Sequence, residues 1–171
     1  MNPAPEKPNI LWLCTDQQRY DTIASLGNPL INTPSIDSLV RDGTAFTRAY
    51  VQSPICAPSR ASFLTGRYPR TTRCRQNGQP IPPGEILVSK MFRDAGYTCG
   101  LAGKLHLASG SDGRVEERTD DGYDVFHWSH HPQPDWPENA YTCLLYTSPS
   151  PRDQRGSRIA ACCWKKKRGG G

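Results

Sequence analysis

Short apolar runs alternate with helix-like segments along the first hundred residues, and this alternation limits the chain to few folds. Residues 9–15 form a continuous apolar run that ends at Asp16, which is typical of a strand buried on both faces of a parallel sheet. We expect two more strands at residues 44–51 and 97–102. Strands separated by helical segments predict an α/β fold, with a mostly parallel sheet flanked by helices.

Three segments between these runs carry helix signals. Thr33 suits the N-cap and Pro34 the first position of a helix that ends near Gly43. A second helix is expected over residues 57–64, and a third over residues 86–95. The alternation is therefore complete enough to predict strand-helix-strand units.

Two longer segments lack such patterns. Residues 68–84 are rich in proline, glycine and polar side chains and predict a long loop, and residues 108–142 are irregular, with no period that builds a core. The histidines at 127–131 raise the alternative of a transition-metal site. The flanking prolines favour an exposed loop instead, in which Trp128 and Trp136 would face a sugar or aryl group.

The last part of the chain differs from the rest. Cys143–Asp153 resembles a translated sequencing-library adapter, and runs of lysine and glycine follow it. We therefore interpret residues 143–171 as a non-native, disordered tail and base the fold on residues 1–142. A natural basic tail is the alternative.

This boundary changes the charge of the chain. The whole sequence has 21 basic and 16 acidic side chains, of which the tail holds seven and one, so residues 1–142 have 14 and 15 and a net charge near −1. Such a balance predicts neither a nucleic-acid nor a membrane partner. Because no apolar segment of signal-peptide length precedes residue 9, we expect a cytoplasmic location.

Four cysteines lie within residues 1–142, and none has the spacing of a zinc site. Cys14 and Cys99 lie in apolar runs, where we expect buried thiols, whereas Cys74 lies in the polar loop. Cys56 alone would also be interpreted as a small buried hydrophobic residue. What distinguishes Cys56 is the sequence that follows it.

Residues 56–67 read Cys-Ala-Pro-Ser-Arg-Ala-Ser-Phe-Leu-Thr-Gly-Arg. With Pro58, Arg60 and the Leu-Thr-Gly-Arg of residues 64–67 at this spacing, the segment resembles the signature of type I sulfatases of the alkaline phosphatase superfamily. In that family the cysteine is oxidised to formylglycine, which here implies Cys56 as the nucleophile. The resemblance also implies a formylglycine-generating enzyme that reads Pro58 and Arg60 on the extended chain.

The chemistry of sulfate ester hydrolysis explains why the family uses an aldehyde as its nucleophile. A serine or thiol nucleophile would leave a sulfated enzyme that is itself hard to hydrolyse. In the aldehyde hydrate, one hydroxyl attacks sulfur, and loss of a proton from the other re-forms the carbonyl and expels sulfate. The reaction implied by the resemblance is hydrolysis of the sulfate ester of a small molecule or saccharide.

Asp16 and Gln17 follow the first predicted strand, at the edge where open α/β sheets place their sites. By itself the pair fits an Asp-led turn. It also resembles the acidic metal pair of sulfatases, which implies a calcium ion, or magnesium, held by these oxygens and by residue 56. The family has two further ligands, for which residues 1–142 offer no convincing copy. The available side chains lack a strand context: Asp120, Asp121 and Asn139.

Gly103–His106 follows the third predicted strand and resembles the family's Gly-Lys-x-His motif. By themselves, a lysine and a histidine at this spacing are usually surface residues. The resemblance implies that Lys104 binds a sulfate oxygen and that His106 hydrogen bonds to the aldehyde hydrate. Arg60 would add a fixed positive charge beside Cys56.

Two alternatives to a working sulfatase stay open. Formylglycine-dependent phosphonate monoester and phosphodiester hydrolases of the same superfamily accept an Asp-Gln metal pair, so Gln17 fits them too. The other alternative is that residues 1–142 are only the N-terminal part of a sulfatase catalytic domain. Such a fragment would lack half of the metal ligands and would be inactive on its own.

Overall fold

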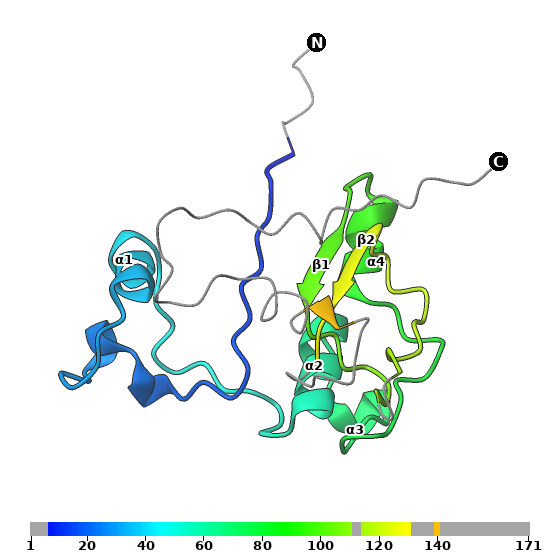
Figure 1. Ribbon diagram of the computed structural model, residues 1–171, viewed down its shortest axis with the longest axis horizontal. Coiled ribbons are helices and arrows are strands. Elements are labelled where there is room, and N and C mark those ends of the chain that lie inside the picture. The colour runs from blue at the N-terminus through cyan, green and yellow to red at the C-terminus, as the bar shows by residue number, and fades with distance from the viewer. Residues whose placement is uncertain (1–6, 111–113, 131–138, 141–171) are drawn as a thin grey trace, which may run out of the picture. The chain divides into compact units, whose positions relative to one another are not determined.

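The computed structural model describes residues 7–110, 114–130 and 139–140. The chain divides into two compact units, Met1–Tyr50 and Val51–Gly171, which are described separately (Figure 1). In the parts of the chain so described, no helix is both long enough and apolar enough to cross a membrane.

The first unit contains two short 3-10 helices and one α-helix. The 3-10 helices are η1 (Tyr20–Thr22) and η2 (Ala24–Leu26), and α1 spans Pro34–Asp42. As predicted, Thr33 occupies the N-cap of α1 and Pro34 its first turn. The Thr33 hydroxyl accepts a hydrogen bond from the Ala24 amide at 2.9 Å, which ties η2 to the start of α1.

The prediction of strands at residues 9–15 and 44–51 is wrong, because the structure has no strand in either range. Leu11 and Leu13 are 81% and 72% exposed, although they lie in the run expected to be buried on both faces. A β-strand requires a neighbouring strand to take up its backbone hydrogen bonds. The first unit contains no strand among its described residues, so its apolar runs have no ladder to join.

The second unit begins with helices that follow the predicted pattern. Helix α2 spans Cys56–Thr65 and ends at Gly66, whose φ of 68° is the left-handed conformation that glycine adopts most easily. Helix α4 spans Val88–Asp94, within the predicted range. The segment predicted as a long loop also contains a short helix, α3 (Pro69–Thr72).

Two short parallel strands complete the second unit. β1 (Gly100–Gly103) pairs in register with β2 (Val125–Trp128), and the Ser129 amide extends the ladder by donating to the Gly103 carbonyl at 2.8 Å (Figure 1). The strand predicted at 97–102 is thus present, shifted by a few residues. β2 was missed, since it lies in a segment without apolar periodicity. The parallel pairing places both carboxyl ends at one edge of the sheet.

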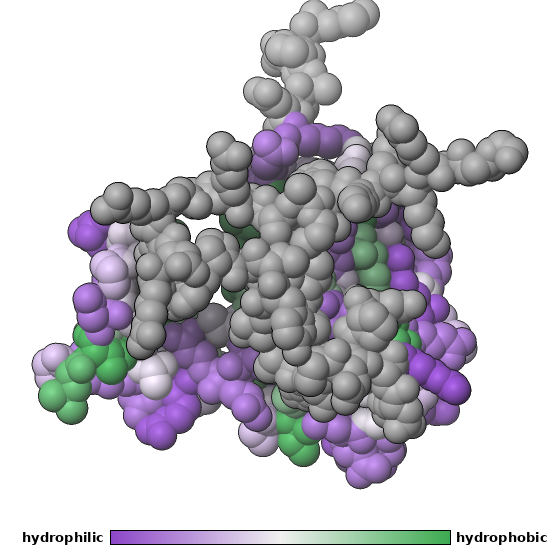
Figure 2. All heavy atoms as spheres, viewed as in Figure 1, coloured by the Kyte–Doolittle hydropathy of each residue, from purple (hydrophilic) through white to green (hydrophobic). Residues whose placement is uncertain are grey.

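The core of the second unit joins α2 to the segments on either side of β1. It is built from small and aliphatic side chains together with one thiol: Ala57, Ala61, Cys74, Ile81, Leu87, Leu105 and Leu107. On the face drawn in Figure 2, the described surface is mainly hydrophilic, with separate hydrophobic patches. The core therefore supports α2 and the segment after β1, which carry the predicted site residues.

The cysteines only partly follow the prediction. Cys14 is exposed, so its prediction as a buried thiol is wrong, and Cys99 is half-buried. Cys74 is fully buried and its thiol donates to the Gln79 carbonyl at 3.4 Å. Burial raises the pKa of the Cys74 thiol, which keeps the thiol protonated.

Candidate active site

Cys56 is the first residue of α2, where the helix dipole favours negative charge. The side chain is half-buried. The next backbone amide, that of Ala57, donates to the Asn77 side-chain oxygen at 3.0 Å. The Asn77 side chain therefore accepts from one of the backbone N–H groups that the first turn of a helix leaves without a partner in the helix. The sequence carries no signal for this contact.

Arg60 lies one turn after Cys56 on the same helix, a spacing that places both side chains on one face. Its side chain is buried, and its Nη1 donates a hydrogen bond to the backbone carbonyl of Lys104. The contact ties the helix that carries Cys56 to the segment after β1. The structure thus brings together two of the predicted site segments, 44 residues apart in sequence.

The segment after β1 turns sharply at His106, which has a left-handed backbone with a φ of 58°. Its imidazole is buried and lies edge-on to that of His130, with the ring centres 4.4 Å apart. His130 follows β2 as His106 follows β1, so both rings lie beyond the carboxyl ends of the strands. Lys104 is half-buried between β1 and His106.

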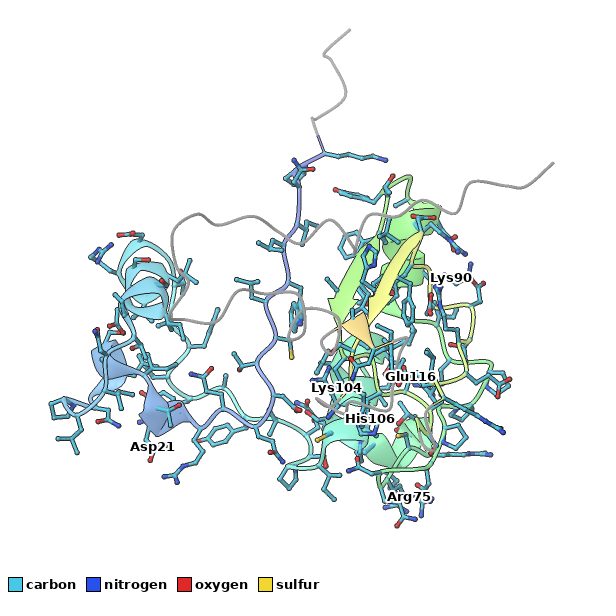
Figure 3. The ribbon with its side chains drawn as sticks, viewed as in Figure 1. Asp21, Arg75, Lys90, Lys104, His106 and Glu116 are labelled. Carbon is cyan, nitrogen blue, oxygen red and sulfur yellow. The ribbon has the colours of Figure 1, made fainter. Side chains whose placement is uncertain are left out.

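Glu116 lies beneath this turn and is only 2% exposed. Its Oε2 accepts from the His106 amide at 2.8 Å and its Oε1 from the Leu107 amide at 3.4 Å. Figure 3 shows Lys104, His106 and Glu116 gathered below the strand ends. Burial raises the pKa of Glu116 to about 7, although both amides, Trp128 and the charge of Arg60 favour the ionised form.

Sequence reasoning missed Glu116 and His130 as members of this cluster. Glu116 belongs to a Glu-Glu-Arg run that resembles a solvated surface, and nothing in its spacing predicts burial. Trp128 was expected in an exposed loop facing substrate, which is wrong, because it ends β2 and is buried. Trp136 and His131 lie outside the described residues.

The predicted metal pair belongs to the first unit. Asp16 and Gln17 are both exposed, and Gln17 has a left-handed backbone with a φ of 56°. A carboxylate and an amide oxygen match the donors that calcium and magnesium prefer. Among the described residues, no group of three or more His, Cys, Asp or Glu side chains could hold a metal ion. The pair thus fits part of such a site.

Other acidic side chains that had been available as ligands are engaged in ion pairs. Asp120 pairs with Lys90 at 3.1 Å and with Arg93 at 2.8 Å, and hydrogen bonds from these two cations lower its pKa. Asp121 is buried and accepts from the Arg118 guanidinium. The ion pairs of Asp120 hold the segment before β2 against α4, whereas the contact between Asp121 and Arg118 lies within that segment.

Comparison with known proteins identifies the family. The sulfatase family model matches residues 8–153, well over half of the chain. The match runs past residue 142, and the tail boundary drawn there stays a prediction. An ulvan-active sulfatase of Formosa agariphila is 40% identical over 103 residues, covering 60% of this chain and 20% of that protein. Bovine arylsulfatase A is 37% identical over 117 residues, covering 64% and 23%.

Solved structures agree with the sequence matches. A protein in complex with its substrate D-glucosamine-2-N,6-O-disulfate has a TM-score of 0.61 and 29% identity, covering 72% of this chain and 23% of that chain. Phosphonate monoester hydrolase of Agrobacterium radiobacter has a TM-score of 0.58 and 27% identity, covering 67% and 24%. The chain spans only about a fifth of the length of the curated relatives it matches. The predicted sulfatase-like α/β fold is confirmed, and the chain belongs to the sulfatase family.

Proposed function

We propose that this chain contributes the nucleophile and part of the sulfate-binding site of an enzyme that hydrolyses sulfate esters. The observation that carries the proposal is the contact between Arg60 and the Lys104 carbonyl. It joins the helix that begins at Cys56 to the segment that carries Lys104 and His106. Two motifs that are separate in the sequence are thereby held in one cluster of the second unit.

Cys56 is proposed to act after conversion to formylglycine by a maturation enzyme. An aldehyde hydrate at this position supplies a nucleophile that releases sulfate without leaving a stable sulfated enzyme. The first turn of α2 favours negative charge at residue 56, and Arg60 adds a cation that burial and its hydrogen bond keep in place. These features would stabilise the anion formed during hydrolysis.

Lys104 and His106 are proposed to complete the binding of the sulfate group. Lys104 is half-buried and carries a compact charge on a flexible stem, which suits a sulfate oxygen. The imidazole of His106 would hydrogen bond to the hydrate and move a proton at its hydroxyl. Asp16 and Gln17, in the first unit, are proposed as two oxygen ligands of a calcium or magnesium ion, the metal that the resemblance to sulfatases implies.

The proposed substrate is the sulfate ester of a small molecule or saccharide. Names of similar proteins support this class, since they include ulvan-active, steryl and N-acetylgalactosamine-6-sulfatases. A phosphonate monoester is the second candidate, which the similarity to the Agrobacterium radiobacter hydrolase favours. Both substrates present a tetrahedral anion to the same cationic side chains.

The two candidates are separated by parallel kinetics on a full-length, matured sulfatase that carries this segment. We expect a higher kcat/KM for an aryl sulfate than for the matching aryl phosphonate, and loss of both activities in Cys56→Ala. Faster turnover of the phosphonate would favour the second candidate. Hydrolysis of either ester at an unchanged rate in Cys56→Ala would contradict the role of residue 56 altogether.

A further inference from the structure

We propose that Glu116 is a positioning residue for the site histidine, whose backbone it holds in the conformation that presents the imidazole beside α2. The proposal rests on the function proposed above, because that function assigns His106 the hydrogen bond to the aldehyde hydrate. It starts from one unusual feature of the backbone. His106 has a φ of 58°, a left-handed conformation that a residue with a side chain rarely adopts.

The left-handed turn creates a site for an anion. When one residue of a pair is left-handed, successive backbone N–H groups point into the same concavity, which binds negatively charged groups. Here the amides of His106 and Leu107 both point to Glu116, at 2.8 and 3.4 Å from its two oxygens. The concavity is thus filled by a carboxylate of this chain and is not available to a sulfate group.

The surroundings of Glu116 hold the carboxylate in place. The charge of Arg60 acts on it from α2, and the buried side chain of Trp128, at the end of β2, also favours the ionised carboxylate. Arg60 also donates to the Lys104 carbonyl, so one buried cation supports both ends of the motif. The imidazoles of His106 and His130 pack against each other at the same turn, and half-buried Lys104 lies two residues before His106.

Glu116 therefore acts through the backbone and has no contact with the reacting atoms. A carboxylate accepts from both amides at once, whereas a glutamine offers one acceptor oxygen and places an NH₂ group against the second amide. Loss of the second acceptor would release the left-handed turn and move the imidazole of His106. A displacement of about 1 Å in a catalytic group can lower the rate about 100-fold.

The first test is the NMR spectrum of the 171-residue chain as a function of pH. We expect the His106 and Leu107 amide protons to shift downfield together as Glu116 ionises, with an apparent pKa of about 7. Glu116→Gln should remove this shift, and Glu117→Gln, a change at the exposed neighbour, should keep it. The ring carbons of His106 are followed in the same spectra, so that a change at the imidazole is distinguished from a change at the carboxyl group.

Two outcomes of this test would overturn the proposal. One is the absence of a common shift of the two amide protons in the unsubstituted chain. This outcome can be measured even if Glu116→Gln fails to fold. The other is an unchanged shift in a folded Glu116→Gln, which would show that a group other than Glu116 causes it.

The second test uses steady-state kinetics of the full-length, matured sulfatase that carries this segment. Glu116→Gln should lower kcat by roughly 10-fold or more with little change in KM, because His106 is misplaced while Lys104 still binds the sulfate group. Glu117→Gln should leave both constants unchanged. An unaltered kcat in Glu116→Gln would refute the positioning role while leaving the function proposed for Cys56 intact. Activity that survives in Cys56→Ala would refute that function and, with it, the catalytic purpose assigned to the turn.

Discussion

Arg60 shows how one side chain serves both the fold and the site. It is buried, it donates to the Lys104 carbonyl, and its charge offsets that of buried Glu116. The resemblance to sulfatases predicted a cation beside Cys56, but not this second contact. A backbone acceptor far away in sequence leaves no pattern in the sequence, so only the fold reveals it.

We expect Arg60→Ala to destabilise the chain by roughly 1–3 kcal/mol, since it leaves the Lys104 carbonyl without this donor in a buried position. The measurement is urea unfolding followed by tryptophan fluorescence. Arg75→Ala, at an exposed position in the same unit, should change the free energy of unfolding by about 0.5 kcal/mol or less. Equal effects of the two substitutions would contradict the account of Arg60.

Glu116 makes stability depend on pH in a defined direction. Its pKa is about 7 in the folded chain, above the ordinary value of 4.5, so the folded state binds more protons than the unfolded state between these values. The contribution of Glu116 to the free energy of unfolding therefore falls as the pH rises from 4.5 to 7, by on the order of 3 kcal/mol.

This dependence is measured as the difference between the unsubstituted chain and Glu116→Gln in urea unfolding at several pH values. The difference should shrink or reverse as the pH rises through this window, because only the unsubstituted chain loses the contribution of the protonated carboxyl. Glu117→Gln is the matched control and should follow the unsubstituted chain. Parallel curves for the chain and Glu116→Gln would show that the carboxyl does not titrate there.

At the scale of elements, helices were predicted far better than strands. The signals for α1, α2 and α4 are local: a proline in the first turn, an apolar stripe and a glycine at the end. Strands depend on neighbours that can be distant in sequence. Apolar residues 9–15 form no strand, while the polar segment before residue 130 supplies β2, because pairing with β1 and burial of Trp128 decide the outcome.

The segment before β2 passes very close to α4, and Gly122 marks the contact. Its φ is 80°, and a Cβ atom there would lie 2.4 Å from the backbone of Lys90. Gly122→Ala should therefore lower stability by at least about 2 kcal/mol, through both the strained backbone and the clash. Gly84→Ala is the matched control, since a Cβ at Gly84 meets no atom within 4 Å.

Thermal unfolding by circular dichroism checks the pair of glycine substitutions. A large drop in Tm is expected for Gly122→Ala and little change for Gly84→Ala. If the two variants melted together, the segment before β2 would not be packed against α4 as the structure describes.

At the scale of the whole molecule, the chain contains the helix that begins at Cys56 and the motif after β1, and the described part of the chain has only a small sheet. It spans about a fifth of the length of its curated relatives, and its described residues contain a two-stranded sheet and no group of three or more His, Cys, Asp or Glu side chains that could hold a metal ion. The family follows from short motifs in the sequence, and the nucleophile role of Cys56 stays a prediction.

We therefore expect no detectable hydrolysis of an aryl sulfate by the 171-residue chain, even after maturation and with calcium added. The physical reason is that the ligands predicted in this chain, Asp16, Gln17 and residue 56, are too few to fix a calcium ion that prefers six to eight ligands. The measurement is release of the aryl alcohol over long incubation. Turnover that disappears in Cys56→Ala would contradict this expectation.

Maturation should be independent of turnover, which makes it the most direct test of the central claim that Cys56 is the sulfatase nucleophile. The chain is expressed with a formylglycine-generating enzyme, and the peptide that contains residue 56 is examined by mass spectrometry. We predict that the thiol of Cys56 is replaced by an aldehyde, and that Arg60→Ala, which alters the recognised sequence, abolishes the conversion. An unmodified Cys56 thiol under conditions that mature a known sulfatase would contradict the account.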